Sequence, residues 1–141
     1  MNITGSCFCG LIEYEAELEG EGIGICHCRD CQIFSGSAFR TSGMVSPQRF
    51  RFTRGEPKIF AKIADSGAVR RMAFCGECGT HLCSLPEETE EERGYVSIRV
   101  ASSHQFHQLK PVAELFCASR VSWLSDQEGA AQFDGMIPRP K

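Results

Sequence analysis

Seven of the cysteines in this chain fall into three short groups that could bind metal ions. The groups are Cys7 and Cys9; Cys26, Cys28 and Cys31; and Cys75 and Cys78. Thiolates this close together repel one another unless a cation compensates their charge, and zinc is the usual divalent ion for clustered sulfur ligands. Seven ligands are too many for one tetrahedral site and too few for two. The count therefore predicts a closed four-sulfur site that holds the fold and a three-sulfur site whose open position allows chemistry.

The spacing within the groups indicates which sulfurs share an ion. Residues two apart on an extended chain point to the same face, so each Cys-x-Cys pair can bind one ion, while the intervening Phe8 and His27 point away. The segment Cys75–Cys78, followed by Gly79, has the pattern of a zinc knuckle, in which glycines allow a tight turn. We expect a structural zinc on Cys7, Cys9, Cys75 and Cys78, and a second zinc on Cys26, Cys28 and Cys31.

Disulfides and a redox pair fit the cysteines less well. The total of nine is odd, the first six residues lack the basic and apolar parts of a secretory leader, and a disulfide across Cys-x-Cys would be strained. A redox pair at Cys75 and Cys78 would need a strand–helix–strand context that the sequence does not show. Cys83 and Cys117 lie outside the groups in apolar surroundings, and we expect both to be buried free thiols.

Length and charge limit the classes of function. A chain of 141 residues predicts one domain over 1–141, with a tail from about residue 135 that we expect to fray. The formal net charge of -3 argues against a nucleic-acid partner, and no apolar run is long enough to span a membrane. Free thiolates persist in reducing compartments, so we expect a cytoplasmic protein, either a monomer or a homodimer.

Alternating apolar and polar residues predict a mainly β fold. In the clearest run, residues 11–18, Ile12, Tyr14, Ala16 and Leu18 alternate with three glutamates, which is typical of a strand with one wet face. The other expected elements are strands at 23–28, 36–45, 49–53, 59–63, 69–74, 80–85, 95–100 and 112–117, a short turn of helix at 29–35, and an acidic, solvated loop at 86–93.

The polar residues near the cysteines leave several interpretations open. His27 could be a structural residue, a proton carrier or substrate contact, or a zinc ligand. The backbone amides of 35–37 could line a small anion pocket, or the segment could simply turn the chain. We expect His81 on a strand, and His104 and His107 in a loop with nothing nearby to recruit them as ligands.

The cysteine groups and their flanking residues resemble the glutathione-dependent formaldehyde-activating enzyme family, also called the centromere-protein-V-like family. The segments that carry the resemblance are 5–10, 26–31, 36–39, 74–80 and 119–124. The resemblance implies a mainly β, Mss4-like fold of folded-over antiparallel sheets stabilised by zinc. It also implies a structural zinc on the first and last cysteine groups and a second zinc on the middle group, where the founding activity is placed.

The activity implied by this resemblance is the formation of S-hydroxymethylglutathione from glutathione and formaldehyde, which is grouped with the carbon–sulfur lyases. A thiol entering the open position of a three-cysteine zinc would bind as its thiolate, the form that attacks an aldehyde. We therefore predict Cys26, Cys28 and Cys31 as catalytic residues, two zinc ions as cofactors, and a small thiol such as glutathione as partner. The alternative is a zinc-stabilised binding module without catalysis, because Mss4-like scaffolds also serve as interaction domains.

The same resemblance suggests that several arginines bind the substrate. Candidates to bind the carboxylates of a glutathione-like thiol are Arg29, Arg40, Arg70 and Arg71. We expect Trp123 to lie in the core rather than to form a platform for substrate.

Overall fold

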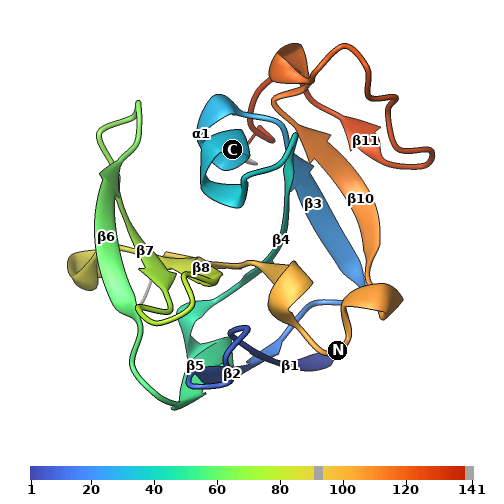
Figure 1. Cartoon of the computed structure of the whole chain (residues 1–141). Coiled ribbons are helices and arrows are strands. Elements are labelled where there is room, and N and C mark those ends of the chain that lie inside the picture. Colours follow the sequence, from blue (N-terminus) through green and yellow to red (C-terminus); the bar gives the residue numbers. More distant parts are fainter. Residues whose placement is uncertain (91–93, 139–141) are drawn as a thin grey trace.

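The computed structural model of the chain describes residues 1–90 and 94–138, and its architecture is mainly β, as predicted (Figure 1). A three-stranded antiparallel sheet has the order β1-β2-β5, with β1 (Asn2–Ser6), β2 (Glu13–Glu17) and β5 (Phe50–Arg54). A larger sheet has the order β11-β10-β3-β4-β9-β8-β7-β6. Its strands are β3 (Gly22–Cys26), β4 (Arg40–Val45), β6 (Lys58–Ile63), β7 (Val69–Phe74), β8 (His81–Leu85), β9 (Val96–Ile98), β10 (Lys110–Leu115) and β11 (Ala131–Gln132).

The remaining regular elements are short. They are the helix α1 (Arg29–Ser35) and 3-10 turns at Pro47–Arg49, Glu88–Glu90, Val100–Ser102, Phe106–Gln108 and Cys117–Ser119. None of the helices in the described residues is long and apolar enough to cross a membrane. The predicted strand 69–74 and the predicted helical turn 29–35 coincide with β7 and α1.

The small sheet follows the predicted alternation. Ile12, Tyr14, Ala16 and Leu18 are all buried, and the glutamates between them face solvent or lie at its edge. The neighbouring strand β1 was not expected, because Ile3 is its only apolar side chain and the other positions are polar residues and glycine, which carry little strand signal. Tertiary contact stabilises this strand in place of local propensity, since all of β1 pairs with β2 in antiparallel register.

The large sheet is bent, so that two groups of strands face each other across α1 (Figure 1). On one side, β3 pairs antiparallel with β4 and parallel with β10. The parallel pairing places Leu115 opposite Cys26, and the Leu115 carbonyl accepts a hydrogen bond from the amide of His27 at 3.0 Å. A strand far along the sequence therefore fixes the backbone inside the middle cysteine group.

The helix α1 contacts both sides of the bent sheet. Phe34 packs against the rings of Phe60 on β6 and His81 on β8, with centroid distances of 6.2 and 5.5 Å. On the other side, the Gln32 side chain donates to the carbonyl of Ser119 at 3.2 Å. These contacts hold a helix of only seven residues, which would not be stable alone.

The C-terminal end of α1 replaces the predicted start of a strand at residue 36. Gly36 has a left-handed conformation with φ of 61°, which suits glycine, and ends the helix. The amides of Gly36 and Ser37 bond to carbonyls of the last helical turn, including that of Gln32. The prediction of an anion pocket formed by these amides is therefore wrong, and the alternative of a turn is correct.

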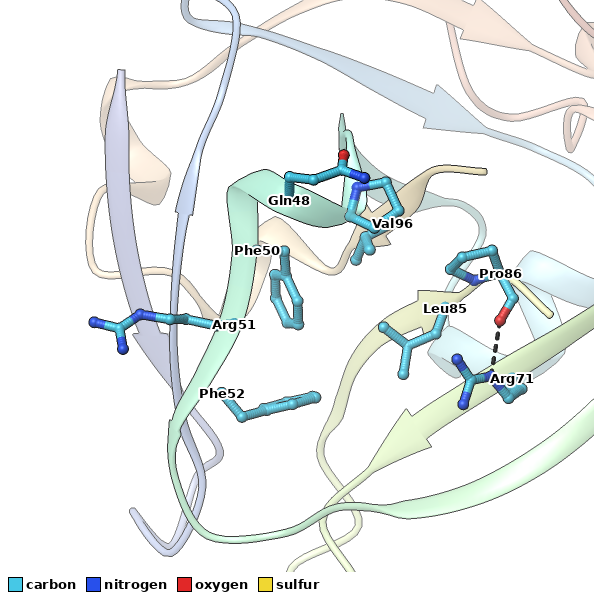
Figure 2. A pocket seen from close by; sticks show the side chains of 9 residues that line it. Gln48, Phe50, Arg51, Phe52, Arg71, Leu85, Pro86 and Val96 are labelled. Atoms are coloured by element: carbon cyan, nitrogen blue, oxygen red, sulfur yellow. Dashed lines mark hydrogen bonds between the residues drawn. The ribbon is translucent and has the colours of Figure 1, made fainter. Parts of the chain in front are cut away.

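The larger cavity lies between the small sheet and the strands β7 to β9. Its volume is about 400 Å³, and Figure 2 shows the side chains of Phe50, Phe52 and Leu85 around it, as the same-face placement of the two phenylalanines predicts. Arg71 lies at its edge and donates to the carbonyl of Pro86 at 2.7 Å. No cysteine lines this cavity, so its size does not mark the site of the predicted chemistry.

Several predictions of burial can be compared with the structure. Cys83 is buried as expected, but Cys117 is only half-buried and bonds to polar groups. The prediction for Trp123 is wrong: 74% of this side chain is exposed, because the segment after Ser119 runs along the surface. In the predicted tail, the Gly135 carbonyl accepts a hydrogen bond from the amide of Phe116 at 2.9 Å. Residues 91–93 of the predicted acidic loop and 139–141 of the tail lie outside the described residues.

The contact between β1 and β2 at Gly5 generates a test of the fold. A Cβ atom at Gly5 would lie 2.4 Å from the Tyr14 ring and 2.6 Å from the Ser102 carbonyl oxygen. We expect Gly5→Ala to lower the free energy of unfolding in urea by about 2 kcal/mol, because the ring must move in a packed core. Gly24→Ala is the matched control, since a Cβ there meets nothing closer than the Ser42 carbonyl oxygen at 3.9 Å. Equal stabilities of the two variants would contradict this account.

Candidate metal centres

The first and last cysteine groups converge on one point. The sulfurs of Cys7, Cys9, Cys75 and Cys78 all lie within 4.8 Å of one another, with 3.6 Å between Cys7 and Cys9 and 3.8 Å between Cys9 and Cys75. A tetrahedral zinc with Zn–S bonds of about 2.3 Å places its sulfurs about 3.8 Å apart. The four-cysteine cluster therefore has the spacing that such an ion requires, and it could hold a metal.

Two turns of the same construction present these sulfurs. In the turns Cys7–Ile12 and Cys75–Thr80, the first cysteine amide donates to the carbonyl of the last residue, at 3.0 and 2.9 Å. Each turn also contains a glycine directly after its second cysteine, and Gly10 and Gly79 have φ of 78° and 76°. Cys7 and Cys9 thus meet through a turn, and the predicted extended chain at 7–9 is wrong. Phe8 nevertheless points away from the sulfurs and is 94% exposed.

Hydrogen bonds to sulfur prepare the four-cysteine cluster for a cation. The Ile12 amide donates to the Cys7 sulfur at 3.3 Å, and the Thr80 hydroxyl lies 3.2 Å from the Cys78 sulfur. The bonds from Thr80 lower the pKa of Cys78 to about 5, which favours the thiolate that metals bind. The Thr80 hydroxyl also accepts from the amide of Phe8 at 3.0 Å, so it links the two turns.

The middle group forms a second cluster. The sulfurs of Cys26, Cys28 and Cys31 lie within 4.8 Å of one another. Cys26 ends β3, and Cys28 caps the N-terminus of α1 by accepting from the amide of Cys31 at 3.4 Å. In the part of the chain that the structure describes, no fourth Cys, His, Asp or Glu joins this cluster, which we call the three-cysteine cluster.

Electrostatics favours a negative charge within the three-cysteine cluster. Hydrogen bonds from Cys26 and Cys31 lower the pKa of Cys28 to about 2, and the positive charge of Arg40 acts in the same direction. The bond to Cys28 raises the pKa of Cys26 correspondingly. Three thiols that share protons around one thiolate form a donor set suited to a soft divalent cation.

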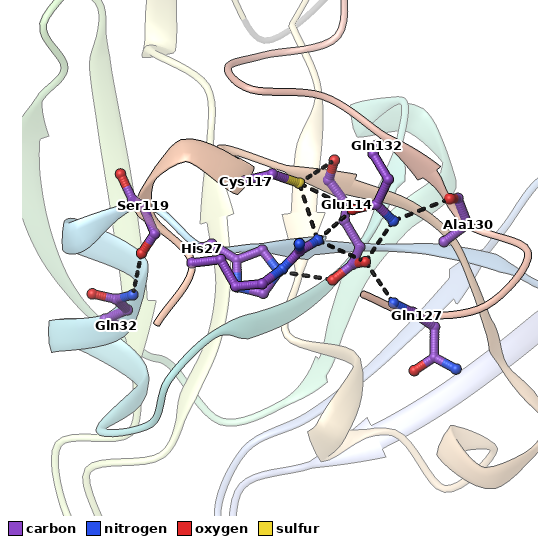
Figure 3. Close-up of polar contacts among 9 residues, drawn as sticks. His27, Gln32, Glu114, Cys117, Ser119, Gln127, Ala130 and Gln132 are labelled. Carbon is purple, nitrogen blue, oxygen red and sulfur yellow. Dashed lines mark hydrogen bonds and ion pairs between the residues drawn. The ribbon is translucent and has the colours of Figure 1, made fainter. Parts of the chain in front are cut away.

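His27 supplies no ligand atom to the three-cysteine cluster, in agreement with the alternation, and Figure 3 shows its ring directed at Glu114. Its Nε2 atom lies 2.8 Å from Oε1 of Glu114, and both side chains are buried. The other carboxylate oxygen of Glu114 accepts from Arg120 at 3.0 Å, from the Gln127 amide at 2.7 Å and from Gln132 at 2.6 Å. His27 therefore belongs to a buried polar network and not to the metal cluster.

The same network determines the charge of Glu114. Burial alone would raise the pKa of this carboxyl, but the hydrogen bonds from the Gln127 amide, His27 and Gln132, with the charge of Arg120, lower it to about 2. Sequence reasoning missed Glu114, because it lies 87 residues from His27 and only the parallel β3–β10 pairing brings the two together. An acidic residue within an apolar strand was the available signal.

A smaller cavity of about 230 Å³ is lined by no cysteine, but one of its lining residues, Arg40, is the register partner of Cys26. Its lining residues are Ser35, Arg40, Thr41, His81, Arg99 and Ala101. Of the four arginines predicted to contact substrate, Arg40 alone lines it. Arg29 is exposed, Arg70 packs over the Tyr95 ring at 4.2 Å, and Arg71 lines the larger cavity. Sequence reasoning missed Arg99.

Comparisons with known proteins identify the family of this chain. A family model described as glutathione-dependent formaldehyde-activating enzyme matches residues 2–119. This chain belongs to that family. A curated relative from Colletotrichum graminicola, whose name provisionally assigns it to the same enzyme, is 30% identical over 96 residues, which are 68% of this chain and 49% of the relative. The chain thus spans about half the length of that relative.

A solved structure supports the fold alone. The crystal structure of a Rhodobacter sphaeroides protein aligns with a TM-score of 0.54 at 16% sequence identity. The alignment covers 92% of this chain and 98% of the other. The family member described here therefore shares its overall fold with a protein of very different sequence.

The position of the four-cysteine cluster predicts that it stabilises the fold. It joins the turn after β1 to the turn after β7, so its ion would connect the two sheets. We expect Cys78→Ser to abolish the cooperative thermal transition seen by circular dichroism, because binding of a structural zinc contributes about 10 kcal/mol or more to folding. Cys117→Ser is the control, since Cys117 lies outside both clusters. Recovery of a folded Cys78→Ser chain of full stability would exclude the structural assignment.

The network around Glu114 predicts a second effect on stability. We expect Glu114→Gln to lower the free energy of unfolding by about 2 kcal/mol, since it leaves buried hydrogen-bond donors without their charged acceptor. The matched control is Glu13→Gln, which removes an exposed ion pair with Arg54 of 3.6 Å and should cost less than about 1 kcal/mol. The measurement is urea unfolding at constant metal content, and similar losses for both variants would refute the prediction.

Proposed function

We propose that this chain is a zinc-dependent enzyme of the carbon–sulfur lyase type that acts on a thiol–aldehyde adduct such as S-hydroxymethylglutathione. The observation that carries the proposal is the three-cysteine cluster, in which three sulfurs converge and no fourth protein ligand joins them among the described residues. Membership of the glutathione-dependent formaldehyde-activating family supports glutathione as the thiol and formaldehyde as the aldehyde. The proposal includes two zinc ions per chain, one in each cluster.

A zinc ion held by Cys26, Cys28 and Cys31 would bind the sulfur of a substrate thiol as its thiolate. The chain's own contribution is to fix the three sulfurs. Cys26 is held by the β3–β10 pairing and Cys28 by the first turn of α1, and the bond between His27 and Glu114 anchors the residue between them. Fixed positions reduce the entropy lost when thiol and aldehyde meet, which can lower the barrier by several kcal/mol.

The proposed reaction is an addition that can run in both directions. The thiolate sulfur attacks the carbonyl carbon of the aldehyde, a carbon–sulfur bond forms, and the carbonyl oxygen takes up a proton to give a thiohemiacetal. The reverse reaction breaks the same bond. Three thiolates already neutralise the charge of a zinc ion, so we assign the three-cysteine cluster to holding and orienting sulfur rather than to polarising the carbonyl. The free cysteines fit a reducing compartment, and we propose the cytoplasm.

The role of the three-cysteine cluster can be tested with thiols. We expect glutathione to bind the zinc-loaded protein and to protect Cys26, Cys28 and Cys31 from alkylation, as measured by mass spectrometry of labelled peptides. Cys31→Ser should abolish this binding but keep the fold and one zinc per chain, because the four-cysteine cluster is separate. Mild chelation should likewise remove one zinc while the fold persists.

Catalysis requires a further comparison, because thiols add to aldehydes without an enzyme. The rate of adduct formation or breakdown should exceed the buffer rate for the intact protein and fall to that rate for Cys31→Ser, with Cys117→Ser as the active control. Binding of glutathione without any acceleration would favour the non-catalytic binding module. Loss of both zinc ions together with unfolding would contradict the division into a structural and an open site.

A further inference from the structure

The smaller cavity is lined by two guanidinium groups. Arg40 extends from β4, where its backbone is the register partner of Cys26, and Arg99 follows β9. Arg99 also interacts electrostatically with Cys31, and Arg40 does so with Cys28. The register pairing of Arg40 with Cys26 places one wall of the cavity next to the strand that ends in the three-cysteine cluster.

Arg99 is a buried cation that has no carboxylate partner among the described residues. Only 5% of this residue is exposed, and its Nη1 atom donates to the backbone carbonyl and the hydroxyl of Ser97, both at 2.9 Å. Within the described part of the chain, its Nη2 atom bonds to the Met72 sulfur alone, at 3.9 Å, and its Nε atom is buried without a partner. Among residues 1–90 and 94–138, no carboxylate forms an ion pair with Arg99. A buried charge of this kind is costly unless it is paired.

Arg40 increases this cost, because it places a second positive charge close to the first. It is half-buried, its Nε atom also has no partner, and it forms no ion pair with a described carboxylate. Burial lowers the pKa of Arg99 to about 9, and the charge of Arg40 contributes to this. Two arginines that repel each other at the wall of a cavity are stabilised together by an anion.

The size and chemistry of the cavity limit the anion. A volume of about 230 Å³ is smaller than the sites that enclose a whole drug-sized ligand, so the cavity fits one arm of a small molecule. The planar guanidinium groups match a carboxylate, and the side chains of Ser35, Thr41 and His81 offer further hydrogen bonds. A thiol whose sulfur lies at the three-cysteine cluster would extend such an arm toward the arginines.

We propose that Arg40 and Arg99 form a carboxylate subsite, so that the substrates of the three-cysteine cluster are thiols that carry a negative charge. This inference rests on the proposed function, which places the substrate sulfur at that cluster. It makes Arg40 and Arg99 specificity-determining residues, and it excludes neutral thiols of similar size as good substrates.

Two probes separate the subsite from the binding of sulfur. S-methylglutathione keeps both carboxylates but has no free thiol, whereas glutathione diethyl ester keeps the thiol and masks the carboxylates. Calorimetric titration of the zinc-loaded full chain should show binding of S-methylglutathione, and Arg40→Gln should weaken it about tenfold or more. Arg40→Lys should recover part of the loss, because the charge returns without the planar fork. Arg54→Gln, an exposed arginine on β5, is the control and should change the affinity by less than about twofold.

Arg99→Lys tests the buried member of the pair and should also weaken S-methylglutathione about tenfold. Should the Arg99→Lys variant fail to fold, Arg40→Gln still tests the subsite, because Arg40 is half-buried and its side chain forms no hydrogen bond or ion pair with the described residues. Absence of S-methylglutathione binding to the wild type, or unchanged affinity in Arg40→Gln, overturns the subsite.

The ester distinguishes failure of the subsite from failure of the proposed function. Ester that binds as tightly as glutathione, with no effect of Arg40→Gln on either, overturns the carboxylate subsite and leaves thiol binding at the cluster intact. Binding of S-methylglutathione that depends on Arg40, with no binding of the ester, supports the subsite and counts against thiol binding at the three cysteines. Weaker binding of the ester than of glutathione by the wild type, but not by Arg40→Gln, supports both.

Discussion

The convergence of four sulfurs between two sheets is the constraint on which the rest of this structure depends. Cys7 and Cys9 follow the first strand of the small sheet, and Cys75 and Cys78 connect two strands of the large one. The buried thiols Cys7 and Cys75 are also members of the hydrophobic core. An ion bound there would add metal–sulfur bonds to the apolar packing of the same residues. The relative position of the two sheets would then not depend on the small core alone.

The three-cysteine cluster is built differently, and the difference suits a different role. Its sulfurs come from one short segment that ends a strand and begins a helix, so they need no distant chain to meet. A segment distant in sequence supports this cluster. The Leu115 carbonyl accepts a hydrogen bond from the amide of His27, and the Glu114 carboxylate bonds to the His27 ring. The three cysteines are close in sequence, and the contacts of His27 with β10 fix their backbone. Such a cluster can exchange a ligand at its open position without unfolding the protein.

Charge distribution separates the two faces of this segment. Behind it, the carboxylate of Glu114 is fully satisfied by donors from His27, Arg120, Gln127 and Gln132. In front of it, Arg40 and Arg99 have no carboxylate partner among the described residues. The Glu114 network is therefore structural, since its carboxylate is paired with a cation and with hydrogen-bond donors of the protein, whereas the two arginines near the three-cysteine cluster have no carboxylate partner of this kind.

The sequence by itself determined the features that depend on neighbouring residues. Cysteine spacing predicted the three-cysteine cluster, alternation predicted the buried face of β2 and the direction of His27, and the helical turn at 29–35 matched α1. These features are local, because spacing of two to five residues fixes the direction of side chains before any tertiary contact forms. The family resemblance extended them to a mainly β architecture of folded sheets, which the structure confirms.

Only the tertiary structure decided what depends on chain segments far apart in sequence. The parallel pairing of β3 with β10 created the partnership of His27 and Glu114, the packing of β1 on β2 made a strand of a weak sequence, and the surface path after Ser119 exposed Trp123. The approach of Arg99 to Arg40 is of the same kind, since their strands meet only in the folded sheet through the β4–β9 pairing. Periodicity reports which side of a strand is apolar but not which strand lies beside it, and the energy of pairing resides in contacts that no local pattern encodes.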